Sequence, residues 1–301
     1  MVGAEPPKPA DSATVILLRE LSPGSCEVLL AERHAGSRTL AGAHVFPGGL
    51  VDAADSSPAL LAASAHVEPG AAATRLGEDP EPAPSLVFWI AAIRELFEEA
   101  GILLATAEGA PLDFGDSVLA ERFRAHRAAL LAGELSFVEL VERERLRLAT
   151  NRLEYFSRWI TPVNAPRRYD ARFFVAELPA GQAPVHDERE TASVTWFTPA
   201  AALERSQAGA LTLAPPTVRT LEDLHNLGST ARILEAARAR LFPPVLPKVV
   251  ALGGRMTILY PGDVAYGGTV PGEPAGEDAP GPRNRLVLDG AVWRSIRSAA
   301  P

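Results

Sequence analysis

Three glutamates at helical spacing are the residues of this chain best suited to chemistry. They lie in the stretch V-F-W-I-A-A-I-R-E-L-F-E-E-A-G-I-L-L, residues 87–104, as Glu95, Glu98 and Glu99. On a helix of 100° per residue, Glu99 falls about 40° and Glu98 about −60° from Glu95, so the carboxylates share one narrow face. Apolar residues fill the opposite face, and Gly101 suits the left-handed position that ends a helix. The stretch therefore predicts an amphipathic helix with an acidic face.

This acidic face has two interpretations. Many helices carry E-x-x-E-E simply as a solvated surface, where like charges at i,i+4 cost roughly a few tenths of a kcal/mol. The alternative is a site for Mg²⁺ or Mn²⁺, which take carboxylate oxygens and keep waters for the phosphates of a substrate. A bound dication would relieve the repulsion between Glu95 and Glu99, where Arg94 is the interspersed cation. The helix alone does not decide between the two.

A segment upstream favours the cation site. It reads H-V-F-P-G-G-L-V-D-A-A-D, residues 44–55, and its paired Gly48 and Gly49 would let main-chain amides approach a substrate's phosphate. Together the two segments resemble the Nudix box, G-x5-E-x7-R-E-U-x-E-E-x-G-U, in which U is aliphatic. The second half matches at every specified position from Arg94 to Ile102, and the first half matches at Gly49.

The chain departs from the Nudix box at one residue and in one spacing. Asp55, a shorter carboxylate, stands where the motif has its first glutamate. It is separated from Arg94 by 38 residues where the motif has seven, so 31 residues are inserted. Nearly all of this insertion is the segment 56–85. Pro58 to Ala65 is expected to form a short helix, and the Pro-, Gly- and acid-rich remainder a surface excursion that could act as a lid.

The resemblance implies a fold, a reaction and a set of site residues. The fold is α/β, a mixed β-sheet sandwiched between helices. The reaction is Mg²⁺- or Mn²⁺-dependent hydrolysis of a nucleoside diphosphate linked to another moiety. Glu95, Glu98 and Glu99 would hold the cation, which positions and acidifies a water. Asp55 is the nearest further metal ligand, and Arg94 would orient the glutamates through ion pairs.

Other residues are candidates for contacts with the substrate. Arg33 ends L-L-A-E-R, which echoes a coenzyme A signature. Arg167 and Arg168 occupy a loop and suit phosphate or base recognition, although ordinary surface arginines would look the same. In the proteins that this chain resembles, an acidic loop before the last strand often supplies an extra base or metal ligand. Glu188 and Glu190 are both candidates for that role.

Within the family, the resemblance is to the peroxisomal-type coenzyme A diphosphatases. It is carried by F-P-G-G-x-x-D-A-A-D, by the long insertion, and by W-I-T-P followed by R-R-Y-D-A-R-F-F. The implied substrate is coenzyme A or acyl-CoA, cleaved to 3′,5′-ADP and 4′-phosphopantetheine. Two alternatives stay open: a diphosphatase for ADP-ribose or NADH-type dinucleotides, and a weakly active binding module, since Asp55 replaces the glutamate.

Both strands and helices are expected around these residues. Two β-rich runs, 14–19 and 27–32, are separated by a Pro-Gly turn and predict a hairpin. Downstream, Thr198-Pro199 is a good helix start. The other expected helices are 116–131, 136–148 and 215–241 with a break near Gly228, and the other expected strands are 155–161, 172–177, 193–197, 249–252, 256–260 and 286–288.

The chain divides into a Pro- and Ala-rich tail, residues 1–12, expected to be disordered, a catalytic domain over 13–242, and a Pro/Gly-rich extension with short strands over 243–301. The extension is expected to pack on the catalytic domain or on a second subunit of a homodimer. Within it, Asp263 and residues 283–285 are candidates for reaching the site.

The composition narrows the class of protein. A net charge of −8 argues against a general nucleic-acid or anionic-membrane binder, and the partner that the resemblance implies is a small-molecule nucleotide. The single cysteine excludes an internal disulfide and fits a reducing compartment. No apolar run approaches the roughly 18 residues of a membrane span, and no secretory signal is evident, so we expect a cytoplasmic protein. The six histidines lack metal-ligand spacing, which leaves carboxylate–metal chemistry.

Overall fold

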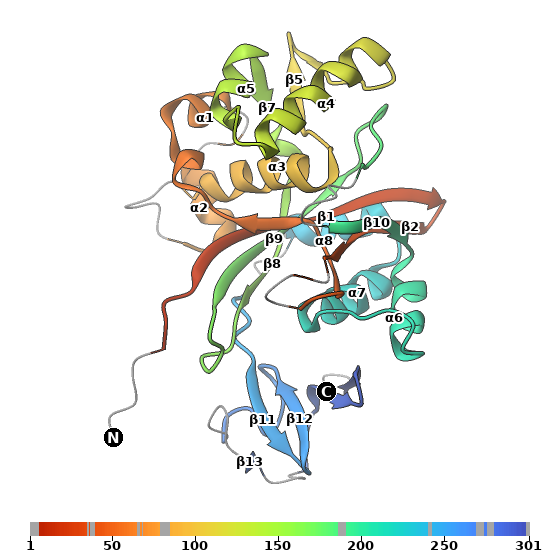
Figure 1. Cartoon of the computed structure of the whole chain (residues 1–301). Helices are drawn as coiled ribbons and strands as arrows, with labels where there is room; N and C mark the ends of the chain where they lie inside the picture. Colours follow the sequence, from red (N-terminus) through yellow and green to blue (C-terminus); the bar gives the residue numbers. More distant parts are fainter. Residues whose placement is uncertain are drawn as a thin grey trace.

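The structure, a computed structural model, describes residues 6–34, 36, 40–64, 67, 69–78, 85–185, 191–239, 243–268, 274–275 and 280–298. Seven of the described strands form a mixed sheet of order β10-β2-β1-β9-β8, in which β3 pairs with β2 and β4 with β1 (Figure 1). Their bounds are β1 Ala10–Ser22, β2 Ser25–Arg33, β3 His44–Val45, β4 Gly48–Leu50, β8 Glu154–Ile160, β9 Tyr169–Glu177 and β10 Thr191–Phe197.

Helices cover both faces of this sheet. One face carries α1 Pro58–Ala63, α2 Pro69–Leu76, α3 Val87–Ala100, α4 Ser117–Leu131 and α5 Phe137–Arg143, with a small sheet of β5 Ala105–Ala107, β6 Ala110–Pro111 and β7 Leu146–Leu148. The other face carries α6 Pro199–Gln207, α7 Pro215–Leu227 and α8 Thr230–Ala239. There are also two 3₁₀ turns among the described residues. The turn η1 Ala53–Ser56 lies between β4 and α1, and η2 Thr150–Arg152 lies between β7 and β8. The predicted α/β sandwich is therefore confirmed.

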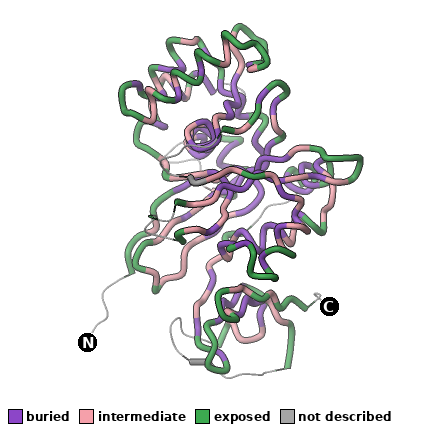
Figure 2. The backbone as a smooth tube through the Cα atoms, turned by 45° about the vertical axis from the view of Figure 1, so that its right-hand side comes forward, coloured by how far each residue is buried: buried purple, intermediate pink, exposed green. Residues whose placement is uncertain are grey.

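The central strand β1 belongs to two hydrophobic cores at once. Val15 and Leu17 are fully buried in the core that contains α3, whereas Ile16 and Leu18 are fully buried in the core that contains α6, α7 and α8. Alternate residues of a strand point to opposite faces, so a strand covered on both sides becomes continuously apolar. Buried backbone accordingly runs through the middle of the molecule in Figure 2.

β1 also splits the sheet in a way that creates room for the site. It pairs with β2 antiparallel from Leu18 to Ser22, and with β4 antiparallel from Ser12 to Thr14. On its other side it runs parallel to β9 from Ala10 to Leu18. β4 therefore pairs with the first half of β1, where β1 is not paired with β2. This places Gly48 and Gly49 against α3.

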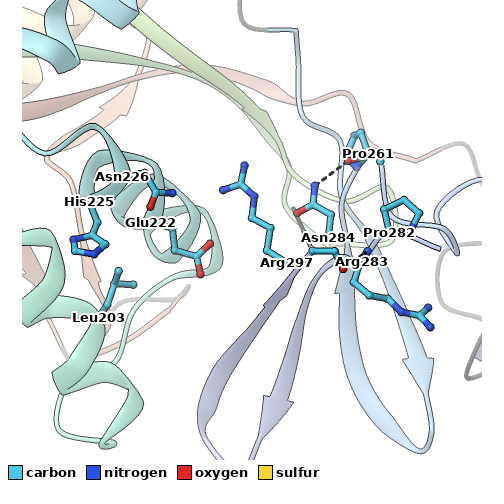
Figure 3. A pocket seen from close by; sticks show the side chains of 11 residues that line it. Leu203, Glu222, His225, Asn226, Pro261, Pro282, Arg283, Asn284 and Arg297 are labelled. Carbon is cyan, nitrogen blue, oxygen red and sulfur yellow. Dashed lines mark hydrogen bonds between the residues drawn. The ribbon is translucent and has the colours of Figure 1, made fainter. Parts of the chain in front are cut away.

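The extension folds as a separate five-stranded sheet of order β13-β11-β12-β14-β15. Its strands are β11 Lys248–Leu252, β12 Arg255–Leu259, β13 Pro274–Ala275, β14 Asn284–Asp289 and β15 Val292–Arg297. It packs on the face of the catalytic domain opposite α3, where Ile258, Tyr260 and Leu286 join the second core. A hollow of about 710 Å³ separates it from α7, and Arg297 lies between Glu222 and Asn284 there (Figure 3).

Some expected boundaries were wrong. β1 begins at Ala10, inside the expected tail, because its first residues pair with β9. The helix expected over 136–148 ends at Arg143, because Arg145 has a φ of 49° and Leu146–Leu148 pairs with β5. In the insertion, α1 was expected and α2 was not; the lid role stays a prediction. None of the described helices is long and apolar enough to span a membrane.

Candidate active site

The acidic helix α3 has a defined position at its start and a defined end. Near its start, the indole N–H of the fully buried Trp89 donates to the carbonyl of Leu153 at 3.1 Å. At its end, Gly101 takes a left-handed φ of 69°, and its N–H donates to the carbonyl of Phe97 at 2.9 Å. A glycine suits this position because it adopts positive φ without a Cβ penalty. The acidic face therefore has a defined direction.

Two carboxylates of α3 meet the glycine turn. The N–H of Gly48 donates to Glu99 Oε2 at 3.0 Å. Gly49 lies so close to α3 that a Cβ added there would be 2.5 Å from Glu95 Oε2. Both glutamates are buried, with exposed fractions of 8% for Glu95 and 9% for Glu99. The structure thus brings together the two halves of the interrupted Nudix box, and a side chain at Gly49 would have to displace the Glu95 carboxylate.

Arg94 joins the helix to the loop before the insertion. Its Nε and Nη2 each lie 2.9 Å from an oxygen of Asp55, and Nη2 also donates to the carbonyl of Leu50 at 2.8 Å. Its Nη1 lies 2.7 Å from Glu95 Oε1 and 3.5 Å from Glu98 Oε1. Burial by itself lowers the pKa of Arg94, but the hydrogen bonds to Asp55 and the neighbouring carboxylates outweigh it and raise the pKa.

Asp55 therefore differs from its expected role as a metal ligand. Its side chain is 1% exposed, both oxygens accept from Arg94, and Oδ2 also accepts the N–H of Asp52 at 2.8 Å. Among the described residues, the contacts of this carboxylate are with Arg94 and its own loop, so it would have to leave Arg94 before it could bind a cation. The geometry makes Asp55 the residue that holds Arg94 in place across the inserted segment.

The donor types of the site fit a hard divalent cation. Asp55, Glu95 and Glu98 lie within 3.5 Å of the Arg94 guanidinium, and Glu99 accepts from Gly48 beside them, so four carboxylates gather at this end of the loop and helix. Within the described ranges, no three His, Cys, Asp or Glu side chains already stand as a metal-binding cluster. Binding a cation therefore requires the glutamates to turn from their present partners. Glu98, with 24% of its side chain exposed, is the most accessible of the three.

Arg127 of α4 is a contact that the sequence did not predict. Its Nε and Nη2 donate to the carbonyl of Glu98 at 3.0 and 2.8 Å, and the residue is 8% exposed. A cation at the carboxyl end of a helix satisfies a carbonyl that lacks an intrahelical partner and complements the helix dipole. Nothing in the local pattern of α4 signals this contact, since it depends on how two helices pack.

The predicted substrate-binding arginines lie in three different surroundings. Alternation along β2 from the buried Leu29 puts Arg33 on the α3 face, at the end of its strand. Arg168 donates to the carbonyls of Thr161 and Pro7, at 3.2 and 2.9 Å, and so fixes the β8–β9 loop against the start of the chain. Arg167 is exposed in the same loop. Their roles toward a substrate stay predictions.

The remaining candidates are an acidic pair before β10 and a group in the extension. Glu188 and Glu190 lie outside the described residues. Asp263 and Arg285 form a buried ion pair within the extension, with Nη2 2.6 Å from Oδ1 and Nε 2.8 Å from Oδ2. Because the extension packs on the opposite face of the sheet from α3, the expectation that Asp263 and residues 283–285 reach the site was wrong.

Comparison with solved structures identifies the fold. The crystal structure of a Nudix hydrolase from Alicyclobacillus acidocaldarius aligns with a TM-score of 0.54 and 24% sequence identity, covering 76% of this chain and 96% of that chain. The fold is therefore that of the Nudix hydrolases, as the sequence predicted.

Sequence comparison identifies the family. The model of the NUDT19 Nudix domain matches residues 9–224. The acyl-coenzyme A diphosphatase NUDT19 of Gallus gallus is 33% identical over 288 residues, 82% of this chain and 74% of the relative. The protein of the same name from Homo sapiens is 28% identical over 275 residues, 79% of this chain and 72% of the relative. The chain belongs to the NUDT19 family of Nudix hydrolases.

Proposed function

We propose that this protein is a Mg²⁺- or Mn²⁺-dependent diphosphatase that hydrolyses coenzyme A or acyl-CoA, releasing 3′,5′-ADP and 4′-phosphopantetheine or its acyl derivative. The observation that carries the proposal is the meeting of Glu95 and Glu99 with Gly48–Gly49, in a chain whose relatives are named acyl-coenzyme A diphosphatases. An acidic helix over a glycine turn suits a substrate whose reacting group is a diphosphate.

In this proposal, Glu95, Glu98 and Glu99 hold the cation. A divalent cation there supplies charge neutralisation at the phosphoryl oxygens and lowers the pKa of a bound water. Arg94 bridges Glu95 and Asp55, and so keeps the catalytic helix and the glycine turn in register. The buried position of Glu95 and Glu99 excludes bulk water from their surroundings, which strengthens electrostatic interactions with the substrate.

The test is to incubate the protein with Mg²⁺ and, separately, coenzyme A, ADP-ribose or NADH, and to follow the product nucleotides. We expect coenzyme A to give 3′,5′-ADP with the highest kcat/KM. Preferred hydrolysis of ADP-ribose or NADH would instead identify the protein as a diphosphatase for ADP-ribose or NADH-type dinucleotides. No hydrolysis of any of the three by folded protein would favour a binding module.

A matched pair of variants links the activity to α3. Glu98→Gln keeps the size of the side chain and removes its charge, so kcat should fall by about two to three orders of magnitude while the fold is unchanged. Glu142→Gln, on the exposed surface of α5, makes the same chemical change away from the site and should behave as wild type. Equal activity in the two variants would remove the helix from the mechanism.

A further inference from the structure

A buried ion cluster lies beside the catalytic helix and is not used by the proposed reaction. Arg158 of β8 forms a fork with Asp170, with Nε and Nη2 at 2.8 and 2.7 Å from its two oxygens. Arg172 of β9 donates through Nη1 to Asp11 at 2.7 Å. The same Nη1 also lies 3.4 Å from Asp170 Oδ1, so Asp170 contacts both arginines and Asp11 contacts Arg172. The third carboxylate, Glu78, comes from the insertion.

Glu78 occupies an anion position between the two guanidinium groups. Its Oε1 lies 2.6 Å from Arg172 Nη2 and 3.0 Å from Arg158 Nη1, and its Oε2 accepts the hydroxyl of Ser85 at 3.2 Å. Asp11 and Asp170 already balance the two arginines, so Glu78 is a surplus negative charge. Two guanidinium groups converging on one oxygen is an arrangement that suits a phosphate as well as a carboxylate.

The anion position also has an unused donor. Arg172 is 4% exposed, and its Nε is buried with no hydrogen-bond partner among the described residues. Leaving a buried donor unsatisfied is costly, so such a group commonly signals a ligand that is absent. The carboxylates at its edge reach solvent, since the Asp11 side chain is 56% exposed and that of Glu78 is 19% exposed.

The cluster is placed next to the acidic face of α3. Arg172 of β9 is the strand partner of Ala13 of β1, and Ala13 is paired on its other side with Gly49 of β4. Gly49, which lies beneath Glu95, is therefore two strand spacings from Arg172. This corresponds to about 10 Å between their Cα atoms. The Arg172 guanidinium lies on the α3 side of the sheet, 3.9 Å from the ring centroid of Phe88. A phosphate bound there and a diphosphate at Gly49 could belong to one nucleotide.

We propose that Arg158 and Arg172 form a subsite for a second phosphate of the substrate, a phosphomonoester separate from the diphosphate. Glu78 of the insertion fills this subsite when no substrate is bound and leaves it when the phosphomonoester enters. The inference rests on the proposed function, since coenzyme A carries such a group as the 3′-phosphate of its ribose, a few covalent bonds from the diphosphate.

The test compares coenzyme A with 3′-dephospho-coenzyme A, which lacks only that phosphate. Wild type should prefer coenzyme A by about tenfold or more in kcat/KM, the effect of losing a charge-assisted contact. Arg158→Lys, which cannot keep the fork to Asp170 and also reach the phosphate, should reduce the preference to within about threefold. Glu78→Gln removes the competing charge and should increase the preference. If the cluster were purely structural, these substitutions would change kcat/KM for both substrates by the same factor.

The control is Arg75→Lys, which makes the same chemical change at an arginine of α2 that lies 3.5 Å from Glu154 and outside the cluster. It should leave the substrate preference unchanged. Equal kcat/KM for the two substrates in wild type, or an unchanged preference in Arg158→Lys, would overturn the subsite while leaving the diphosphatase activity intact.

A binding measurement separates this inference from the proposed function. Isothermal titration calorimetry with 3′,5′-ADP and 5′-AMP requires no turnover. Tighter binding of 3′,5′-ADP that depends on Arg158 would support the subsite even if coenzyme A is not hydrolysed. Equal affinity of the two nucleotides, together with no hydrolysis of coenzyme A, would reject both proposals.

Discussion

Adding one methyl group at Gly49 should separate catalysis from stability. In Gly49→Ala the new Cβ would lie 2.5 to 2.6 Å from the carboxylate of Glu95, about 1 Å nearer than ordinary contact. The end of a flexible side chain can yield, at a cost of roughly 1 kcal/mol for a strained rotamer. A displacement of about 1 Å in a group that positions the reaction costs on the order of 100-fold in rate. We therefore expect kcat for coenzyme A to fall about 100-fold with little loss of stability.

The neighbouring glycine provides the comparison. In Gly48→Ala the Cβ would collide with backbone atoms, the carbonyl oxygen of Ala13 and the Cα of Thr14. Backbone in a core strand cannot move aside without breaking the pairing of β1 with β4. This variant should therefore lose about 3 kcal/mol of unfolding free energy.

The assay is urea unfolding of both variants together with kcat measured from the release of 3′,5′-ADP. The reasoning predicts that Gly49→Ala is folded and nearly inactive, whereas Gly48→Ala is unstable. Wild-type kcat in Gly49→Ala would show that the position of Glu95 does not matter. A loss of stability in Gly49→Ala equal to that in Gly48→Ala would show that the turn, and not the carboxylate, yields to the new methyl group.

Further outcomes follow from the same contacts. Asp55→Asn should lower the unfolding free energy by about 2 kcal/mol in urea titrations, because it removes the carboxylate charge that both Nε and Nη2 of Arg94 contact. Arg127→Met should reduce kcat by about tenfold and speed hydrogen exchange at the end of α3, because the last carbonyls lose their donor. Burial raises the pKa of Asp263, but hydrogen bonds from a guanidinium and two backbone amides outweigh it and lower the pKa. The stability it contributes is present above the unfolded-state pKa near 4 and is lost as pH falls through the lower folded-state value. Asp263→Asn should therefore flatten the acid limb of the stability curve below about pH 4.

Features coded in adjacent residues could be predicted from the sequence. The amphipathic stretch gave α3, including its end at Gly101, and Thr198 caps α6 as its sequence indicates. Gly228, with a φ of 83°, divides α7 from α8 at the expected place. Each of these depends on residues within one or two helical turns, where spacing, capping and glycine act directly.

Features that depend on distant packing could not be predicted. Asp55 was assigned to the metal because its motif position suggests a carboxylate, but the fold directs both of its oxygens to Arg94. The contact of Arg127 with α3 joins two helices that are separate in sequence. Leu146–Leu148 continued a helical pattern and became a strand because β5 offered backbone partners. In each case tertiary contacts outweigh local propensity.

The central claim is that the carboxylates of α3 bind a divalent cation against a diphosphate. The most direct measurement is a Mn²⁺ titration followed by electron paramagnetic resonance, on wild type, Glu99→Gln and the surface control Glu142→Gln. Glutamine at position 99 can still accept the N–H of Gly48, so the turn should persist while the charge is lost. We predict that Glu99→Gln binds Mn²⁺ at least tenfold more weakly than wild type, and that Glu142→Gln binds it with the wild-type affinity. Equal Mn²⁺ affinity in all three proteins would contradict it.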